Sequence, residues 1–164
     1  MDAIEAIKTR RSVRRYTAEP IPDEVLEDII DCARLAPTAR NEQPWTFVVI
    51  TDPEVRERLS QEARKGRFIA EAPVCVAVFC RSEAAAPLQD ASAAVENIML
   101  AARAYGLGSC WVNSYHKEHS ATVAALLGCP RERELMAMIA LGHPEDIPSP
   151  SKKPLGEVMF WQGF

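Results

Sequence analysis

Residues 74–80, Val-Cys-Val-Ala-Val-Phe-Cys, form an uninterrupted apolar run. A strand with one face in water alternates between apolar and polar residues, whereas this run is apolar at every position. It therefore predicts a central strand that other elements cover on both faces. Cys75 and Cys80 are then small core residues, since no Cys-x-x-Cys spacing for zinc or an iron–sulfur cluster occurs in the chain.

Helical and strand patterns alternate along the whole chain. Helices are predicted over residues 2–12, 22–35, 52–66, 90–105 and 118–127. Strands are predicted over residues 45–51, 74–80, 109–115 and 135–142. Residues 38–44 lack periodicity and are predicted to be a loop. The alternation indicates a sheet with helices on both faces, which is a three-layer arrangement.

Length and charge bound the possible functions. The 164 residues suit one domain spanning positions 1–164, with no linker or repeat that would divide them. No apolar run approaches the roughly 20 residues that cross a bilayer. The N-terminus is acidic before it is basic, unlike a signal peptide, and the number of cysteines is odd, so a cytoplasmic protein without disulfides is expected. The net charge of -4 argues against a nucleic-acid partner.

Four arginines nevertheless occupy six positions near the start, in Arg-Arg-Ser-Val-Arg-Arg. Arg10, Ser12 and Arg14 point the same way if this segment is extended, and Arg10 and Arg14 share a face if it is helical. Guanidinium groups and a hydroxyl that converge on one point match the oxygens of a phosphate monoester. The segment is therefore a candidate phosphate site.

The alternative is a solvated basic face. In that interpretation the arginines pair with nearby carboxylates, for which Glu19, Asp23 and Glu24 are the candidates. The cluster by itself does not decide between the two.

Five stretches together resemble the FMN-dependent nitroreductase family. The first is Arg-Arg-Ser-x-Arg at residues 10–14, and the second is the Pro-x-x-x-Asn-x-Gln-Pro-Trp pattern at residues 37–45. Residues 90–112 are similar to the family's long central helix and the strand after it. Residues 138–146 resemble its Leu-Gly-x-Pro segment, and residues 152–161 resemble its C-terminal arm. The resemblance covers nearly the whole chain, in order.

This resemblance implies an α+β fold, a three-layer α/β/α sandwich with a mostly antiparallel central sheet. It also implies an intertwined homodimer with FMN at the subunit interface. Residues 145–164 would be the exchanged C-terminal arm. The segment from His143 onward does carry four prolines, and it has an apolar stretch at 158–161 that needs a surface to cover, which another subunit would supply.

The resemblance also assigns the residues that would bind the cofactor. Those expected at the FMN phosphate are Arg10, Arg11, Ser12, Arg14 and Lys152. Those expected to line the flavin ring from the opposite subunit are Thr38, Ala39 and Asn41. Those expected to approach the ring from the end of a strand are Val112, Asn113 and Ser114. Gly142 would leave room for backbone near the cofactor.

Two departures from the family pattern bear on these assignments. The family often has Ser-Ser after the proline of the second motif, where this chain has Thr38-Ala39, so one hydroxyl contact is lost or comes from the backbone. Longer members place an Asn and a Lys at the pyrimidine edge of the flavin. Here the corresponding segment is short, and either Lys65 or Arg67 is a candidate for that role.

The activity implied is that of an FMN-dependent NAD(P)H oxidoreductase. NADH or NADPH would reduce the flavin, and a nitroaromatic, quinone or similar small acceptor would then take its place in a ping-pong cycle. Two alternatives stay open: a reductive dehalogenase or dedicated-metabolite oxidase on the same scaffold, and a flavin carrier or sensor without turnover. No residue is expected to act as catalyst in place of the flavin and no metal is expected. His116, His119 and His143 are interpreted as surface groups.

Overall fold

A computed structural model describes all 164 residues and contains one four-stranded sheet. The strands are β1 (Trp45–Ile50), β2 (Val74–Arg81), β3 (Gly108–Asn113) and β4 (Arg133–Gly142). Their order is β1-β2-β4-β3, and every neighbouring pair is antiparallel. β2 and β4 are therefore the inner strands, whereas β1 and β3 form the two edges.

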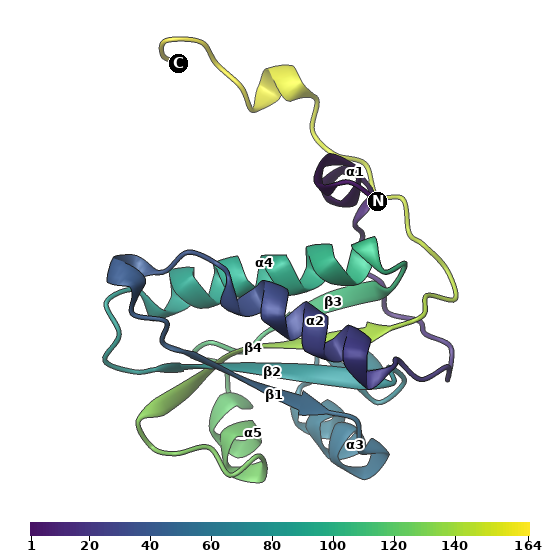
Figure 1. Ribbon diagram of the computed structural model, residues 1–164, viewed down its shortest axis with the longest axis vertical. Helices are drawn as coiled ribbons and strands as arrows, with labels where there is room; N and C mark the ends of the chain where they lie inside the picture. The colour runs from purple at the N-terminus through teal and green to yellow at the C-terminus, as the bar shows by residue number, and fades with distance from the viewer.

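Helices cover both faces of this sheet (Figure 1). α2 (Asp23–Arg34) and α4 (Pro87–Ala104) lie on one face, and α3 (Pro53–Glu62) and α5 (Ser120–Leu126) lie on the other. α1 (Ala3–Thr9) packs against α4 on the side away from the sheet. The expected α+β, three-layer architecture is confirmed. None of these helices combines the length and apolarity needed to cross a membrane.

β2 shows why both faces must be covered. Val74, Val76 and Val78 pack into the core formed with α2 and α4. Cys75, Ala77 and Phe79 alternate with them and pack into the core formed with α3 and α5. All six side chains are buried, which confirms the prediction of a central strand made from the apolar run.

Four predicted helix boundaries are wrong by two to four residues. α1 ends at Thr9 rather than near 12, because Arg10 already leaves the helical region. α4 begins at Pro87 rather than at 90, because proline is well tolerated at the first helical position. α3 ends at Glu62 rather than near 66, since Ala63 already leaves the helical region. α5 begins at Ser120 rather than at 118, and the Ser120 hydroxyl turns back to the carbonyl of Ser114.

The segment at 38–44 and the C-terminal tail also differ from expectation. Residues 38–44 are not wholly loop, because they contain the 3₁₀ turn η1 (Ala39–Asn41). The tail forms no strand; it contains only the short turn η3 (Leu155–Glu157) and leads away from the body (Figure 1). Phe160 and Trp161 are 53% and 77% exposed in the single chain.

Candidate functional site

The arginine-rich segment at residues 10–15 is fixed along the β3 edge of the sheet. Ser12 forms a parallel bridge with Ser109, and the Val13 N–H donates to the Ser109 carbonyl at 2.9 Å. Gly108 permits this approach, since a Cβ at that position would stand 2.8 Å from the Cβ of Val13. The backbone that carries the arginines therefore has a defined place beside β3.

Arg11 and Arg15 form hydrogen bonds or an ion pair within the chain. The Arg11 guanidinium donates to the carbonyls of Lys8 and Arg10, at 3.0 and 2.7 Å, where α1 ends. Such a contact satisfies carbonyls that the helix leaves free. Arg15 pairs with Glu145 at 2.9 Å. Arg11 thus has a local explanation, and its role toward a phosphate stays a prediction.

Arg10 lies beside α4, whereas Arg14 lies over Phe68, which packs against the core formed with α3 and α5. Burial raises the pKa of the Cys110 thiol, and the positive charges of Arg14 and Arg10 both act on this thiol to lower it. Arg10 lies 3.4 Å from a Glu96 carboxylate oxygen. The Arg14 guanidinium lies 5.8 Å from the ring centre of Phe68 and has no carboxylate within ion-pair distance. Arg14 is therefore the cation of this segment that is free to bind an anion.

The partners expected for a basic face, Glu19, Asp23 and Glu24, are wrong, because Arg10 and Arg15 pair with Glu96 and Glu145 instead. None of these carboxylates forms an ion pair with an arginine of the segment. Glu19 instead approaches His143 at 3.8 Å.

Arg14 lines a pocket of about 620 Å³ beside β3. This volume lies within the usual range for small-molecule sites. Positive side chains outnumber carboxylates around it. The charged lysine, arginine and carboxylate side chains are Arg14, Arg64, Lys65, Lys117, Glu62 and Glu118. An open pocket with an unpaired guanidinium and an excess of positive charge suits a small anionic ligand.

The turn after α3 brings Lys65, but not Arg67, into this pocket. Gly66 lets the turn press against the end of β3, because a Cβ on Gly66 would lie 3.1 Å from a methyl of Val112. Of the two candidates for the pyrimidine edge, only Lys65 lines the same pocket as Arg14.

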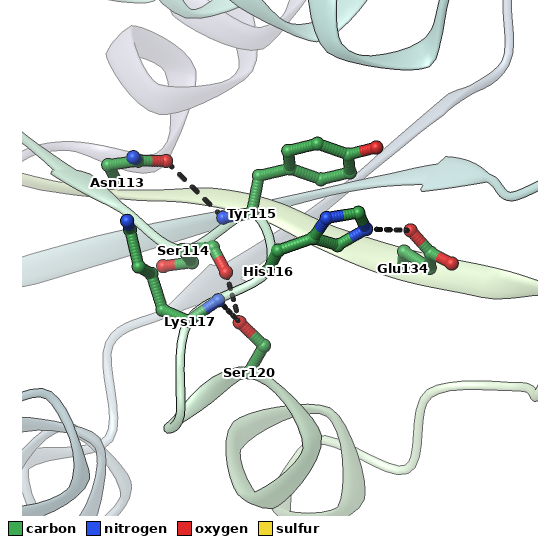
Figure 2. A network of polar contacts seen from close by, with 7 residues as sticks. All are labelled: Asn113, Ser114, Tyr115, His116, Lys117, Ser120 and Glu134. Carbon is green, nitrogen blue, oxygen red and sulfur yellow. Dashed lines mark hydrogen bonds and ion pairs between the residues drawn. The ribbon is translucent and has the colours of Figure 1, made fainter.

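The predicted segment at the end of β3 also borders the pocket. Val112 and Asn113 line it, whereas Ser114 is fully buried just behind. The Ser114 hydroxyl donates to the Val112 carbonyl at 3.2 Å, and the Asn113 side-chain oxygen accepts from the Tyr115 N–H at 3.3 Å. Figure 2 shows how Ser120 closes the same turn from the start of α5. These contacts fix the backbone that faces the pocket.

Two histidines stand on the pocket rim, and they differ. His119 Nε2 lies 3.0 Å from the Ser114 hydroxyl oxygen. Because that hydroxyl gives its proton to Val112, it accepts from the ring, which assigns the proton of neutral His119 to Nε2. Burial, followed by the charge of Lys117, lowers the pKa of His119. His116 is exposed and lies 3.8 Å from Glu134 (Figure 2). The surface interpretation holds for His116 but not for half-buried His119.

The predicted residues at 38–41 belong to a strained loop. We call residues 38–43 the motif loop. Arg40, Asn41 and Gln43 have φ angles of 54°, 57° and 47°. Asparagine tolerates this left-handed conformation, whereas for arginine and glutamine the cost is roughly 1–3 kcal/mol each. The Thr38 hydroxyl accepts from the Gln43 N–H at 3.2 Å and helps to close the loop. Strain of this kind concentrates at functional sites.

Within one chain the motif loop does not line the Arg14 pocket, and it contacts the opposite end of α4 from the start of the arginine segment. The Ala39 N–H donates to Asp90, near the start of α4, at 3.0 Å. Thr9, next to the arginine segment, accepts from Arg103 near the end of α4 at 2.9 Å. Thirteen positions separate Asp90 from Arg103, which is about 20 Å along a helix. A single chain therefore does not join Thr38, Ala39 and Asn41 to the Arg14 pocket.

Gly142 and Lys152 also lie outside the pocket. A Cβ on Gly142 would stand 2.5 Å from Pro73 and 2.8 Å from Tyr16, so close packing already requires glycine there. Lys152 is exposed in the tail. No group of three or more His, Cys, Asp or Glu side chains is placed to hold a metal ion.

Comparison with known proteins assigns the family. Residues 7–73 and 60–143 match the Nitroreductase family. The chain belongs to this family. The match spans the arginine segment, the motif loop and the end of β3, so the family contains all the regions from which the site was built, except the tail.

Individual nitroreductase-family proteins show how similar the chain is. A protein of Archaeoglobus fulgidus, provisionally named NADH dehydrogenase/NAD(P)H nitroreductase, is 37% identical over 88% of this chain and 87% of its own length. The solved FMN-dependent nitroreductase of Clostridium difficile R20291 is 27% identical, with a TM-score of 0.92 over 98% of this chain and 99% of its own. The iodotyrosine deiodinase of Nematostella vectensis is 26% identical over 94% of this chain and 73% of its own length.

Three functional contacts could not be predicted from the sequence. Phe68 and His119 line the pocket, and Asp90 holds the motif loop. Phe68 sits in a short segment without periodicity, and His119 follows a polar stretch that is typical of surface. Asp90 was placed at the start of a helix, where a capping role is the usual explanation.

Proposed function

We propose that this chain is an FMN-dependent NAD(P)H oxidoreductase that reduces small acceptors such as nitroaromatics or quinones. One observation carries the proposal: Arg14, a guanidinium without a carboxylate partner, lines the same pocket as Lys65, Val112 and Asn113. The resemblance assigned these residues to the phosphate, the pyrimidine edge and the ring of FMN. The folded chain provides one pocket in which these residues could each contact the part of FMN assigned to them.

The residues at the pocket fit the chemistry of FMN. A phosphate dianion matches the guanidinium of Arg14, which lines the pocket without a carboxylate partner. Lys65 would place a cation beside the pyrimidine edge, where negative charge accumulates on reduction. The flavin, when bound, supplies the hydride-accepting and hydride-donating centre. The chain's own task is to orient the cofactor and to admit reductant and acceptor in turn.

The site is completed by a second copy in this proposal. A two-fold axis that pairs two α4 helices antiparallel would place the start of one helix beside the end of the other. The motif loop of one copy would then lie beside the arginine segment of its partner, which removes the separation of about 20 Å along α4. Thr38, Ala39 and Asn41 would line the ring from there.

Exposed apolar side chains supply the surface for such a pair. Ile4 and Ile7 on α1 are 60% and 56% exposed. Glu145 ties the start of the tail to Arg15, but residues 151–164 are all exposed and lead away from the body, with Phe160 and Trp161 among them. We propose that residues 1–164 form one domain whose tail wraps the partner, which would also bring Lys152 toward a phosphate.

Dehalogenation is a second candidate activity. It is favoured by the iodotyrosine deiodinase relative, which aligns with 94% of this chain. Both activities would use the same cofactor pocket. They differ in the acceptor, and a panel of nitroaromatic, quinone and halogenated phenolic compounds separates them.

The test is reconstitution followed by reduction. The purified protein is titrated with FMN while flavin fluorescence is recorded, and the yellow complex is then mixed anaerobically with NADH or NADPH. We expect saturable binding, loss of the flavin colour with at least one nucleotide, and its return when an acceptor is added. Protein that takes up no FMN would contradict the proposal. Bound FMN that neither nucleotide reduces would favour a carrier or sensor.

A further inference from the structure

Asp90 is a buried carboxylate whose partner lies far away in the chain. Its side chain is 4% exposed, and Oδ1 accepts from the Ala39 N–H at 3.0 Å across 51 positions. Asp90 does not cap its own helix, because the N-cap of α4 is Ala86 and no side-chain capping bond is present. The helix begins without help from this carboxylate.

The arrangement is costly for stability alone. Asp90 Oδ2 is buried without a hydrogen-bond partner, and no lysine or arginine pairs with the carboxylate. A buried charged oxygen without a partner is destabilising, and the positive end of the α4 dipole offsets only part of this. A small apolar residue would pack in a helix more favourably. The feature that Asp90 uniquely provides is an acceptor for Ala39.

Ala39 is the residue at which the motif loop enters its strained conformation. It directly precedes Arg40, the first of the residues with positive φ. The far end of the loop is held separately, since Arg81 donates to the Glu42 carbonyl at 3.2 Å and Glu42 accepts from the Ala85 N–H at 3.1 Å. Those contacts are exposed, whereas the contact from Asp90 comes from a buried side chain.

We infer that Asp90 is a positioning residue: its carboxylate holds the motif loop in the strained conformation that presents Thr38–Asn41 to the cofactor of the second copy. The inference rests on the proposed function for its second half, the presentation to a cofactor. Its first half, that Asp90 holds the loop, is a property of the chain without any ligand. Asp90 touches neither cofactor nor substrate and acts through Ala39.

The first measurement is backbone hydrogen exchange over residues 36–44 in the protein without FMN. Asp90→Ala removes the acceptor, and we expect exchange of the Ala39 amide to accelerate on the order of tenfold. Asp90→Asn keeps a side-chain oxygen that can accept from Ala39, so it is expected to restore most of the protection. Equal exchange in wild type, Asp90→Ala and Asp90→Asn would overturn the inference.

The second measurement separates positioning from general destabilisation. Val95 lies in the same helix and is fully buried in the core between α4 and the sheet. Its apolar side chain forms no hydrogen bond with the motif loop. Val95→Ala lowers stability by leaving a cavity. At matched fractions folded, we expect Asp90→Ala to weaken FMN binding about tenfold and to change the near-ultraviolet circular dichroism of the bound flavin. Val95→Ala is expected to leave both unchanged.

The outcomes distinguish the two proposals. If Val95→Ala and Asp90→Ala have the same effect on flavin binding and spectrum, Asp90 is merely structural and the inference fails. If wild-type protein binds no FMN, the proposed function fails, while the exchange experiment still decides whether Asp90 holds the loop.

Discussion

The Arg14 pocket and the motif loop provide different halves of a site. In the pocket, which lies between the turn after α3 and the end of β3, side chains dominate: an unpaired Arg14 and Lys65 stand among an excess of positive charge. In the motif loop, beside the start of α4, backbone dominates: three residues have positive φ, and the Ala39 N–H donates to the buried carboxylate of Asp90. The pocket can attract an anion and the loop can present a backbone surface, so each provides what the other lacks.

The largest effect should come from reversing the charge of Arg14 in the pocket. Arg14→Glu replaces the free guanidinium by a carboxylate that repels a phosphate dianion, and we expect FMN affinity to fall by about 100-fold or more. The helical circular dichroism spectrum should not change, because Arg14 makes no ion pair in the folded chain. Fluorescence titration with FMN measures the loss.

Arg58→Glu is the matched control for this charge reversal. Arg58 is exposed on α3 and does not line the pocket. Its reversal changes the net charge equally and should leave FMN affinity within about twofold. If both variants bind FMN as tightly as the wild-type protein does, Arg14 does not bind the phosphate and the proposed role of this pocket is contradicted.

Removing the tail should weaken the dimer and so separate the Arg14 pocket of one copy from the motif loop of the other. Deleting residues 155–164 removes Phe160 and Trp161, which would each bury large apolar areas against a partner. We expect the dimer to dissociate at least tenfold more readily and FMN affinity to fall with it, as measured by analytical ultracentrifugation and titration. A truncated chain that sediments like the full chain at micromolar concentration would show that the tail is not the arm.

Much of the fold could be predicted from the sequence, because hydrophobic burial acts locally and periodically. The run at 74–80 determined the inner strand, and the stripe of apolar residues in 22–35 determined α2. Boundaries were less accurate where a single side-chain contact or a proline decides them. Ser120 and Ser114 set the start of α5, and Pro87 extends α4.

Less of the candidate site could be predicted from the sequence, because the site depends on residues that become neighbours only in the folded chain. The arginine motif indicated a phosphate site, but only the fold shows that Arg11 closes α1 and that Arg14 stays unpaired. No local pattern reveals that Asp90 bonds Ala39 across 51 positions. A partner surface is likewise invisible in one chain, except as apolar residues that remain exposed.

The smallest effect should come from the one pocket histidine that is partly buried. Burial lowers the pKa of His119 below its ordinary value of about 6.5, so the unfolded chain takes up a proton more readily than the folded one. His119 therefore favours unfolding as pH falls below about 6.5, and stability should rise with pH through that window. Urea unfolding at about pH 5 and pH 7.5 measures the slope.

His119→Gln tests the source of this slope. Glutamine retains a donor for Ser114 but does not titrate, so the difference in stability between the two pH values should shrink. An unchanged slope would show that other groups produce it. No histidine forms a hydrogen bond or ion pair with the motif loop, so the effect should be confined to the Arg14 pocket.

The most direct test of a shared site is to combine two defects in mixed dimers. Arg14→Glu disables the pocket, and Ala39→Trp places a bulky side chain on the motif loop. Each homodimer should bind no FMN. Co-expressed with different tags and purified through both, the mixed dimer has one site with an intact pocket and an intact loop, and we predict one FMN per dimer. A mixed dimer that binds no more FMN than either homodimer would contradict the claim that two copies build the site.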